Sequence, residues 1–258
     1  MTETEPLMAG KRGLIMGVAN ERSIAWGIAS AVSAQGAELA FTYQGEALAK
    51  RVRPLAESVG SDIVLPCDVA DDASIDAVFE EIEARWGGLD FLVHAIAYSD
   101  KEELKGKYVD TSRGNFVKSL DISCYSFTAV SARAVPLMNQ GGSLLTLTYC
   151  GAERVMPHYN VMGVAKAALE CAGRYLAAEL GAKKIRVNCI SAGPLRTLSS
   201  MAVGGIDDMF NWTEQKAPLR RNIDAGEVGA TAVYLLSDLS SAVTGTTLYV
   251  DAGYNIMG

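Results

Sequence analysis

The sequence Gly13-Leu-Ile-Met-Gly17-Val-Ala-Asn-Glu-Arg-Ser23-Ile-Ala-Trp-Gly27 predicts a buried strand, a tight turn and the beginning of a helix. Helical character continues to Gln35, where Gly36 ends it. A glycine turn that opens a helix presents free backbone N–H groups and the positive end of the helix dipole to a phosphate. The spacing differs from the standard G-x-G-x-x-G, so an ordinary glycine turn stays open beside a dinucleotide site.

The alternation of strand and helix continues through the whole chain. Strands are predicted at 13–17, 38–43, 60–67, 89–95, 142–149, 185–190 and 246–251, and helices at 23–35, from about 46, at 73–85, within 111–138, at 159–180 and near 227–237. Parallel strands need helical crossovers, so this pattern predicts an α/β, Rossmann-type doubly wound sheet of seven mainly parallel strands with helices on both faces. We expect residues 1–10 to be a flexible tail and residues 11–258 to be a single domain.

Composition is that of an ordinary globular protein, with 49% hydrophobic and 21% charged residues among 258. The net charge of -7 offers nucleic acid or an anionic membrane no general attraction. No apolar run approaches the roughly 18 residues that a membrane-spanning helix requires, and the acidic start is unlike a secretory signal. We therefore expect a cytoplasmic protein that binds neither nucleic acid nor membrane.

Cysteine and histidine usage argues against a metal site. The five cysteines are odd in number and widely spaced, which predicts reduced core thiols. The only histidines are His94 and His158, and there is no paired-cysteine spacing, so zinc would lack its usual ligands. We expect His94 to pack or to bond the backbone and His158 to lie on the surface. A Ser/His/Asp hydrolase is disfavoured for the same reason and because no Gly-x-Ser-x-Gly elbow is present.

Two strand ends carry residues suited to an adenosine. The second strand ends in Thr42-Tyr43-Gln44, without the acid that usually grips the ribose and without an adjacent cation. Gln44 is able to hydrogen-bond ribose hydroxyls, whereas a 2′-phosphate would need a cation, so NADH is favoured over NADPH. Asp68 and Val69 follow the third strand and are suited to bracket adenine. A helix-capping or loop role for Asp68 is an equally good interpretation.

Tyr159 and Lys166 are the strongest local signal for catalysis. On a continuous helix their spacing of seven residues places both on one face, about 10 Å apart along the axis. A lysine near a phenol lowers the pKa of the tyrosine and can hold ribose hydroxyls, while the phenol stabilises an oxyanion. The alternative is a tyrosine at a helix start with a solvated lysine. The position of this helix, after the fifth strand, favours the catalytic interpretation.

The segment 192–217 interrupts the regular pattern. It contains Gly193-Pro194 and a partly apolar, glycine-containing excursion directly after a strand. Ligands sit at the carboxyl ends of strands in doubly wound sheets, so we expect a substrate lid here, with a plain surface loop as the alternative.

Several of these segments together resemble the NAD-dependent enoyl-acyl-carrier-protein (enoyl-ACP) reductases of the short-chain dehydrogenase/reductase superfamily. The resemblance runs from about Lys11 to Met257 and rests on Gly17–Gly27, Ala37–Gln44, Ser61–Leu65, Cys67-Asp-Val-Ala, Asp121-Ile-Ser, Tyr149–Arg154, Tyr159–Gly163, Lys166-Ala, Arg186-Val-Asn and Ile190–Pro194 with Arg196-Thr197. Ordinary superfamily members separate the tyrosine and lysine by three residues. The six residues between Tyr159 and Lys166 are typical of the enoyl reductase branch.

The resemblance implies a function and a set of site residues. It implies NADH-dependent reduction of trans-2-enoyl thioesters carried by acyl carrier protein, in bacterial type II fatty acid synthesis, by a homotetramer. The implied catalytic residues are Tyr159, which bonds the thioester carbonyl, Lys166, which holds the nicotinamide ribose, and Tyr149. The implied cofactor-binding residues are Gly17, Ser23, Ile24, Gln44, Asp68, Val69, Ile96, Ala97, Lys166, Leu195 and Thr197. The implied substrate-binding residues are Tyr98, Tyr149, Tyr159, Met162, Ala202 and Ile206.

One departure and two alternatives accompany this resemblance. Ala95 and Ala97 stand where many relatives carry serine and glycine, and the added methyl groups are expected to narrow the pocket beside the nicotinamide. The first alternative function is a short-chain ketone or alcohol dehydrogenase with the same fold and cofactor. The second is a non-catalytic sensor that binds a dinucleotide, for which an apolar lid and a tyrosine–lysine pair would be unnecessary.

Overall fold

The computed structural model describes residues 6–198, 200 and 206–257, which form one parallel sheet of seven strands in the order β3-β2-β1-β4-β5-β6-β7. The strands are β1 (Arg12–Met16), β2 (Glu38–Tyr43), β3 (Ile63–Pro66), β4 (Phe91–His94), β5 (Gly142–Thr148), β6 (Ile185–Ala192) and β7 (Thr247–Val250). Every neighbouring pair is parallel, which confirms the predicted fold class.

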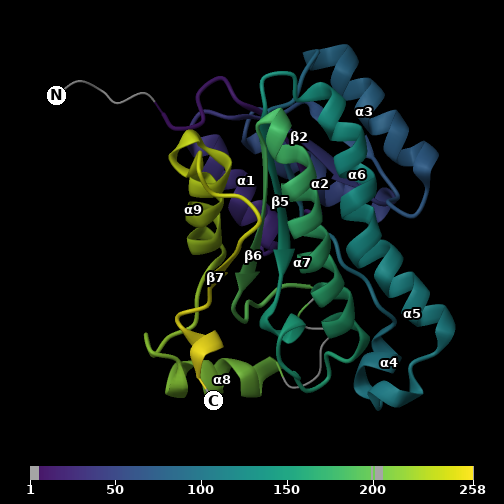
Figure 1. Cartoon of the computed structure of the whole chain (residues 1–258), viewed down its shortest axis with the longest axis vertical. Coiled ribbons are helices and arrows are strands. Elements are labelled where there is room, and N and C mark those ends of the chain that lie inside the picture. The colour runs from purple at the N-terminus through teal and green to yellow at the C-terminus, as the bar shows by residue number, and fades with distance from the viewer. Residues whose placement is uncertain (1–5, 199, 201–205, 258) are drawn as a thin grey trace.

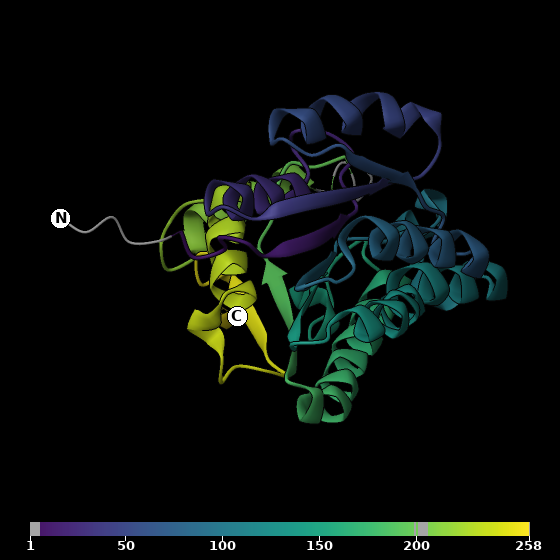
Figure 2. The same cartoon turned by 90° about the horizontal axis from the view of Figure 1, so that it is seen from above.

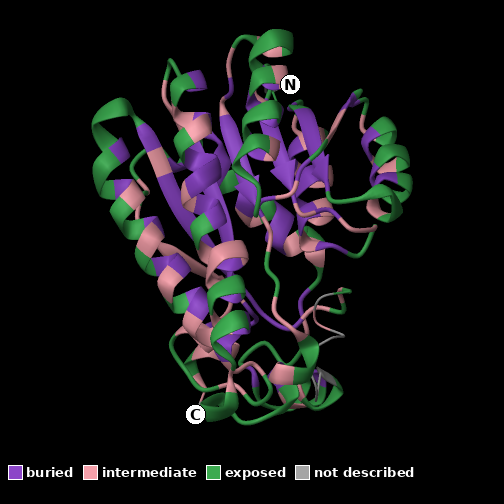
Figure 3. Cartoon of the chain, turned by 90° about the vertical axis from the view of Figure 1, so that its right-hand side faces the viewer, coloured by how far each residue is buried: buried purple, intermediate pink, exposed green. Residues whose placement is uncertain are grey.

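Helices cover both faces of this sheet (Figures 1 and 2). They are α1 (Ile24–Ala34), α2 (Glu46–Ser58), α3 (Asp72–Trp86), α4 (Lys101–Lys105), α5 (Arg113–Leu120), α6 (Ser126–Ala134), α7 (Val161–Leu180), α8 (Ile206–Lys216) and α9 (Ala225–Leu236). Residues of α1, α2 and α9 pack in one core cluster, and residues of α3, α6 and α7 pack in a second. Figure 3 shows the buried strands between helices whose outer sides are exposed.

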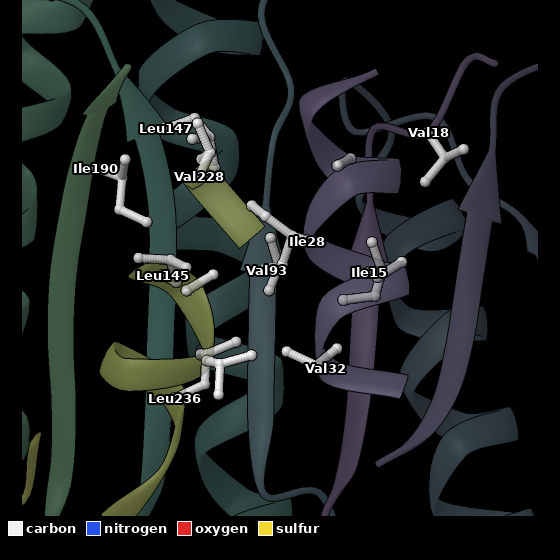
Figure 4. Close-up of a cluster of buried hydrophobic side chains, with 14 of the residues drawn as sticks. Ile15, Val18, Ile28, Val32, Val93, Leu145, Leu147, Ile190, Val228 and Leu236 are labelled. Atoms are coloured by element: carbon white, nitrogen blue, oxygen red, sulfur yellow. The ribbon is translucent and has the colours of Figure 1, made fainter. Parts of the chain in front are cut away.

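The core on the α1 and α9 face is built from aliphatic side chains of the central strands. Ile15, Val93 and Leu145 project from three adjacent strands toward Ile28 and Val228 of the covering helices (Figure 4). All five side chains are fully buried. Burying such side chains stabilises the fold by roughly 1.5–3 kcal/mol each, so this face fixes the central strands whose ends form the site.

Glycines allow α1 and α9 to pack closely. A methyl group on Gly27 would lie 2.5 Å from the carbonyl oxygen of Ala225, and one on Gly229 would lie 2.5 Å from the carbonyl oxygen of Gly27. Both distances are shorter than any normal contact, so the backbones approach only because neither residue has a side chain.

The helical segment predicted within 111–138 is interrupted in the structure. A π-helical turn, Asp121–Tyr125, separates α5 from α6. Inside it, Ser123 Oγ accepts from the backbone N–H of Tyr98 at 2.9 Å. At its end, Ser126 Oγ donates to the carbonyl oxygen of Ile122 at 2.6 Å. Hydroxyl groups that bond backbone atoms in this way compete with regular helical bonds, and π-turns of this kind are frequent at functional sites.

Part of the predicted flexible tail packs on the domain, and residues 1–5 of it lie outside the described residues. Met8 is fully buried, and its backbone N–H donates to the carbonyl oxygen of Gln35 at 2.9 Å. The prediction of flexibility is therefore wrong at Met8, because its apolar side chain gains more by packing in the core cluster with α1 than by remaining in water.

Candidate active site

The strand order places a crevice beside β1, because β2 and β4 lie on opposite sides of it. In doubly wound sheets ligands bind where the order reverses in this way, at the carboxyl ends of the strands. Gly17 follows β1 at this point with φ +99°, and a methyl group on it would lie 2.1 Å from the carbonyl oxygen of Ala95. Only glycine fits here, so the predicted tight turn is present.

The first turn of α1 leaves backbone donors available. Ser23, the residue before the helix, does not cap it; its Oγ accepts from the backbone N–H groups of Ala19 and Asn20 at 3.0 and 3.1 Å. The side chain therefore shapes the loop rather than satisfying the helix. The N–H of Trp26 donates to the carbonyl oxygen of Ser23 at 3.0 Å, so the groups that can meet an anion at the positive end of the dipole are the N–H groups of Ile24 and Ala25.

A cavity of about 410 Å³ lies at this crevice. Six of the predicted cofactor residues line it, namely Gly17, Gln44, Asp68, Val69, Ile96 and Ala97, together with the predicted substrate residue Tyr98. Gln44 Nε2 donates to Asp68 Oδ2 at 3.0 Å, so these two polar side chains hold each other in the lining of the cavity. The cap of α3 is Asp71, so the helix-capping alternative for Asp68 is wrong. The loop alternative is confirmed, because Asp68 Oδ1 accepts from the backbone N–H of Ala70 at 3.0 Å.

Sequence reasoning missed Lys118, which also lines this cavity. Its ammonium lies 4.4 Å from the ring centroid of Tyr98 and 3.3 Å from Asp100 Oδ1. Lysines on predicted helices are usually solvated, and only the tertiary contact with Tyr98 distinguishes this one.

Lys166 is buried in α7, with 6% of its surface exposed. Its Nζ donates to the carbonyl oxygen of Leu147 at 2.7 Å, which ties the helix to the end of β5. Burial lowers the pKa of Lys166 to about 8. The alternative of a solvated lysine is thus wrong, and the ammonium stays mostly protonated at neutral pH.

Tyr159 does not lie on the helix that carries Lys166. The helix begins at Val161, and His158 and Asn160 on either side of Tyr159 have positive φ values of 60° and 40°. The predicted helix start at 159 is therefore wrong, and so is the helical-face argument for the pair.

Asn160, which sequence reasoning also missed, explains this turn. Its Nδ2 lies 3.1, 3.1 and 2.8 Å from the carbonyl oxygens of Glu103, Leu104 and Gly106. Asparagine tolerates left-handed backbone better than most residues, and these contacts favour the turn over another helical residue.

Tyr149 and Tyr159 meet edge to face, with ring centroids 5.1 Å apart. Tyr149 Oη is buried and has no hydrogen-bond partner within the described ranges. Burial raises the pKa of Tyr159, and the neighbouring Cys150 and Glu170 raise it further. The predicted lowering of this pKa by Lys166 is therefore contradicted, because burial outweighs any effect of the ammonium.

The remaining predicted residues lie near the site or outside the described residues. Met162 is buried with Val161 and Leu104, and its sulfur lies 3.8 Å from Ser123 Oγ. Leu195 and Thr197 follow β6, and Ser200 Oγ donates to the carbonyl oxygen of Leu195. Ile206 begins α8, but its side chain is not described, and Ala202 lies outside the described residues.

The part of the predicted lid segment that is described packs on the C-terminus. Arg196 lies 2.8 Å from Asp207 and 4.5 Å from the ring centroid of Phe210, both on α8. Trp212 of the same helix packs edge to face on Tyr254, with centroids 4.8 Å apart. Figure 1 shows α8 and the C-terminus at the end of the sheet toward which the strand arrows point.

The histidines and cysteines mostly lie as predicted. His158 is exposed, while His94 is fully buried and bonds the side chains of Thr146 and Ser126 instead of the backbone. All five cysteines are free thiols, but Cys171 is exposed on α7, so the prediction of core burial is wrong for that one. Its place on the outer side of the helix was not evident from an alanine-rich sequence. Among the residues that the structure describes, no helix is long and apolar enough to cross a membrane.

Comparisons with known proteins agree on one family. The model described as "Enoyl-(Acyl carrier protein) reductase" matches residues 17–255. A Rhizobium meliloti protein named enoyl-(acyl-carrier-protein) reductase (NADH) 2 is 62% identical over 97% of this chain and 93% of its own.

Two solved structures are similar over nearly their full lengths. The enoyl-(acyl-carrier-protein) reductase of Anaplasma phagocytophilum in complex with NAD is 57% identical, with a TM-score of 0.95 over 99% of this chain and 97% of that one. The Bacillus cereus enoyl-acyl carrier protein reductase with NADP+ and an indole naphthyridinone is 50% identical, with a TM-score of 0.96 over 98% of this chain and 99% of that one.

Proposed function

The chain belongs to the enoyl-(acyl-carrier-protein) reductase family, and from this premise we propose that Tyr159 and Lys166 carry out its reaction. The protein is an NADH-dependent oxidoreductase of fatty acid biosynthesis that reduces the double bond of an enoyl thioester carried by acyl carrier protein. Of the functions considered from sequence, the ketone or alcohol dehydrogenase and the sensor have no support in these relatives.

The crevice fits a dinucleotide on physical grounds. The α1 N-terminus lacks a side-chain cap, and the adjoining cavity of about 410 Å³ has polar Gln44 and Asp68 in its lining. We propose that the pyrophosphate meets the α1 N-terminus with Ser23 and Ile24, and that Gln44 bonds the adenosine ribose. Asp68 and Val69 bracket the adenine, and Ile96, Ala97, Leu195 and Thr197 lie along the nicotinamide half.

Lys166 is the observation that carries the catalytic assignment. A buried ammonium held at the end of β5 has little structural purpose that an apolar side chain would not serve better, so we assign it to the nicotinamide ribose. Bound NADH supplies the hydride that reaches the β-carbon of the enoyl group. The ammonium orients the ribose and adds positive field near the developing negative charge.

Tyr159 is proposed to stabilise the thioester oxygen. Negative charge builds on that oxygen as the double bond is reduced, and the phenol donates a hydrogen bond to it. Because burial raises the pKa of Tyr159, the phenol keeps its proton at neutral pH and remains a donor. A proton taken up at the α-carbon completes the reduction.

The acyl chain is proposed to lie beside Tyr98, Tyr149 and Met162. The Tyr149 hydroxyl is buried and unpartnered among the described residues, so a substrate group would satisfy it. We further propose that the segment 192–217, with Ala202 and Ile206, closes over the chain as a lid.

We also propose a homotetramer that uses the outer sides of α6 and α7. Tyr125, just before α6, is 53% exposed, and Tyr175 on α7 is 75% exposed. Aromatic side chains are enriched at protein interfaces, and both helices are rich in small residues that permit close packing. Light scattering of the purified protein tests the assembly.

Turnover of two thioesters tests the function. Purified protein is expected to oxidise NADH with a crotonyl thioester, which has the double bond, and not with an acetoacetyl thioester, which has a ketone instead. Turnover of the ketone in place of the enoyl substrate would establish a short-chain ketone reductase. Binding of NADH with turnover of neither would establish a sensor.

A further inference from the structure

Two buried hydrogen bonds join the end of β5 to α7. Lys166 Nζ donates to the carbonyl oxygen of Leu147 at 2.7 Å, and Thr148 Oγ1 donates to Glu170 Oε1 at 2.6 Å. Glu170 lies one helical turn after Lys166, so both side chains are on the same face of α7. Glu170 is only 7% exposed. A carboxyl group at such a position is costly to bury, and the fold itself does not require one.

We propose that Glu170 is a positioning residue for the reaction, whose carboxylate, anchored by Thr148 on the face of α7 that carries Lys166, acts on the catalytic site through the field it places on Lys166 and Tyr159. The proposal rests on the roles given above to Lys166 and Tyr159. Glu170 acts through them and is not placed in contact with substrate or cofactor.

Burial works against the ammonium, and nearby negative groups oppose that effect. Burial lowers the pKa of Lys166 to about 8, whereas negative charge on Cys189, Cys124 or Glu170 raises it. Burial raises the pKa of Cys189 to about 12 and also raises that of Cys124. Both thiols are therefore uncharged at neutral pH. Of the three groups, Glu170 is the carboxylic acid, whose ordinary pKa lies well below neutral, and its negative form is the one suited to stabilise the ammonium.

The same reasoning applies to Tyr159. Burial raises its pKa, and negative charge on Cys150 or Glu170 raises it further. The pKa of the Cys150 thiol is itself raised to about 11, so this group is neutral as well. Of Cys150 and Glu170, only the negative form of Glu170 therefore disfavours the phenolate of Tyr159. One carboxylate thus favours the protonated form of both catalytic groups.

Thr148 favours the ionised form of that carboxylate against the larger effect of burial. Burial raises the pKa of Glu170, and the hydrogen bond from Thr148 lowers it. Other charged or titratable groups also face these side chains. Those near Lys166 are His94, Cys124, Glu170 and Cys189, and those near Glu170 are Glu153, Tyr159, Lys166, Arg174, Cys189 and Tyr249. His94 is neutral at working pH, because burial lowers its pKa to about 3.

Replacing Glu170 by glutamine isolates the charge. The amide oxygen of the glutamine would still accept from Thr148, but Lys166 would lose its proton at lower pH and Tyr159 would ionise at lower pH. Both pKa values are lowered, so the alkaline limb of the pH–activity profile is expected to move to lower pH by roughly half a unit. The substitution Glu179→Gln is the matched control, because Glu179 is an exposed acid at the far end of α7.

The test measures kcat/KM for NADH and a crotonyl thioester over about pH 6 to 10. Glu170→Gln is expected to shift the alkaline limb, while Glu179→Gln keeps that of the wild type. Thr148→Val removes the hydrogen bond that lowers the pKa of Glu170 and so favours the uncharged acid. The limb is therefore expected to move in the same direction as in Glu170→Gln, and Thr148→Ser is expected to restore it. The Thr148 pair also tests the inference if Glu170→Gln fails to fold.

A second measurement needs neither cofactor nor turnover. The Nζ of Lys166 is titrated by NMR in ligand-free protein labelled with ¹⁵N at lysine, with the signal assigned by its loss in Lys166→Met. Its midpoint is expected to fall in Glu170→Gln. An unmoved midpoint, or lower activity at every pH with no shift of the limb, would overturn the inference. Failure of the wild type to reduce the enoyl thioester would instead refute the proposed function, and the lysine titration would still test Glu170.

Discussion

His94 is expected to make the protein less stable in mild acid, because its imidazole is held inside the core between two hydroxyl groups. Nδ1 lies 3.0 Å from Thr146 Oγ1, and Nε2 lies 2.8 Å from Ser126 Oγ. The ring of Phe127 packs on it, with centroids 5.3 Å apart. Burial lowers the pKa of His94 to about 3, so the folded protein keeps the ring neutral.

The sign and size of the effect follow from proton linkage. Below about pH 6.5 the unfolded chain binds a proton at this histidine, whereas the folded chain binds one only near pH 3, so acid favours unfolding. A pH of 5 is about 1.5 units below the pKa of the unfolded histidine, and this difference corresponds to roughly 2 kcal/mol of lost stability. Above about pH 7.5 this contribution is absent.

Urea unfolding at one protein concentration, compared at about pH 7.5 and pH 5, measures this loss. His94→Gln is expected to be less stable than the wild type at the higher pH but to lose about 2 kcal/mol less on acidification. His158→Gln is the control, because His158 is exposed and should leave the wild-type pH dependence in place. Equal losses in the wild type and His94→Gln would refute the reasoning.

Two further substitutions probe the dinucleotide crevice. Gly17→Ala places a methyl group 2.1 Å from the carbonyl oxygen of Ala95, at a residue with φ +99°. The NADH affinity, measured by fluorescence titration, is therefore expected to fall at least tenfold, which is about 1.4 kcal/mol. An unchanged affinity would mean that the turn does not lie at the cofactor. Gln44→Arg supplies a cation for a 2′-phosphate and is expected to raise the ratio of kcat/KM for NADPH over NADH by about tenfold, whereas an unchanged ratio would contradict the placement of the adenosine ribose.

The local sequence pattern was sufficient to predict the strands and strand ends that form the cofactor crevice. The strand Glu38–Tyr43 was predicted to the residue, since Gly36 bounds it on one side and Gln44 and Gly45 on the other. Because the carboxyl ends of parallel strands share one edge, Gly17, Gln44 and Asp68 were predicted to lie together, and all three line one cavity.

Features that depend on distant backbone atoms were not predictable in this way. The turn at Tyr159 is held by Asn160, whose bonds reach carbonyl groups 54 to 57 residues earlier in the chain. The π-helical turn depends on Ser123, which bonds Tyr98 25 residues away. Nothing in the local sequence distinguishes these side chains from ordinary turn or helix residues. Glu170 was missed similarly, since an acid in a helix normally predicts a solvated face.

The kinetics of Tyr159→Phe and Lys166→Ala test most directly whether one phenol and one ammonium act together on the substrate and cofactor. Tyr159→Phe is expected to lower kcat by roughly a hundredfold or more while the Kd for NADH persists, and Lys166→Ala is expected to weaken NADH binding as well. Tyr108→Phe, at a half-exposed tyrosine, should behave like the wild type. Unchanged turnover of a crotonyl thioester in both catalytic variants would contradict the assignment.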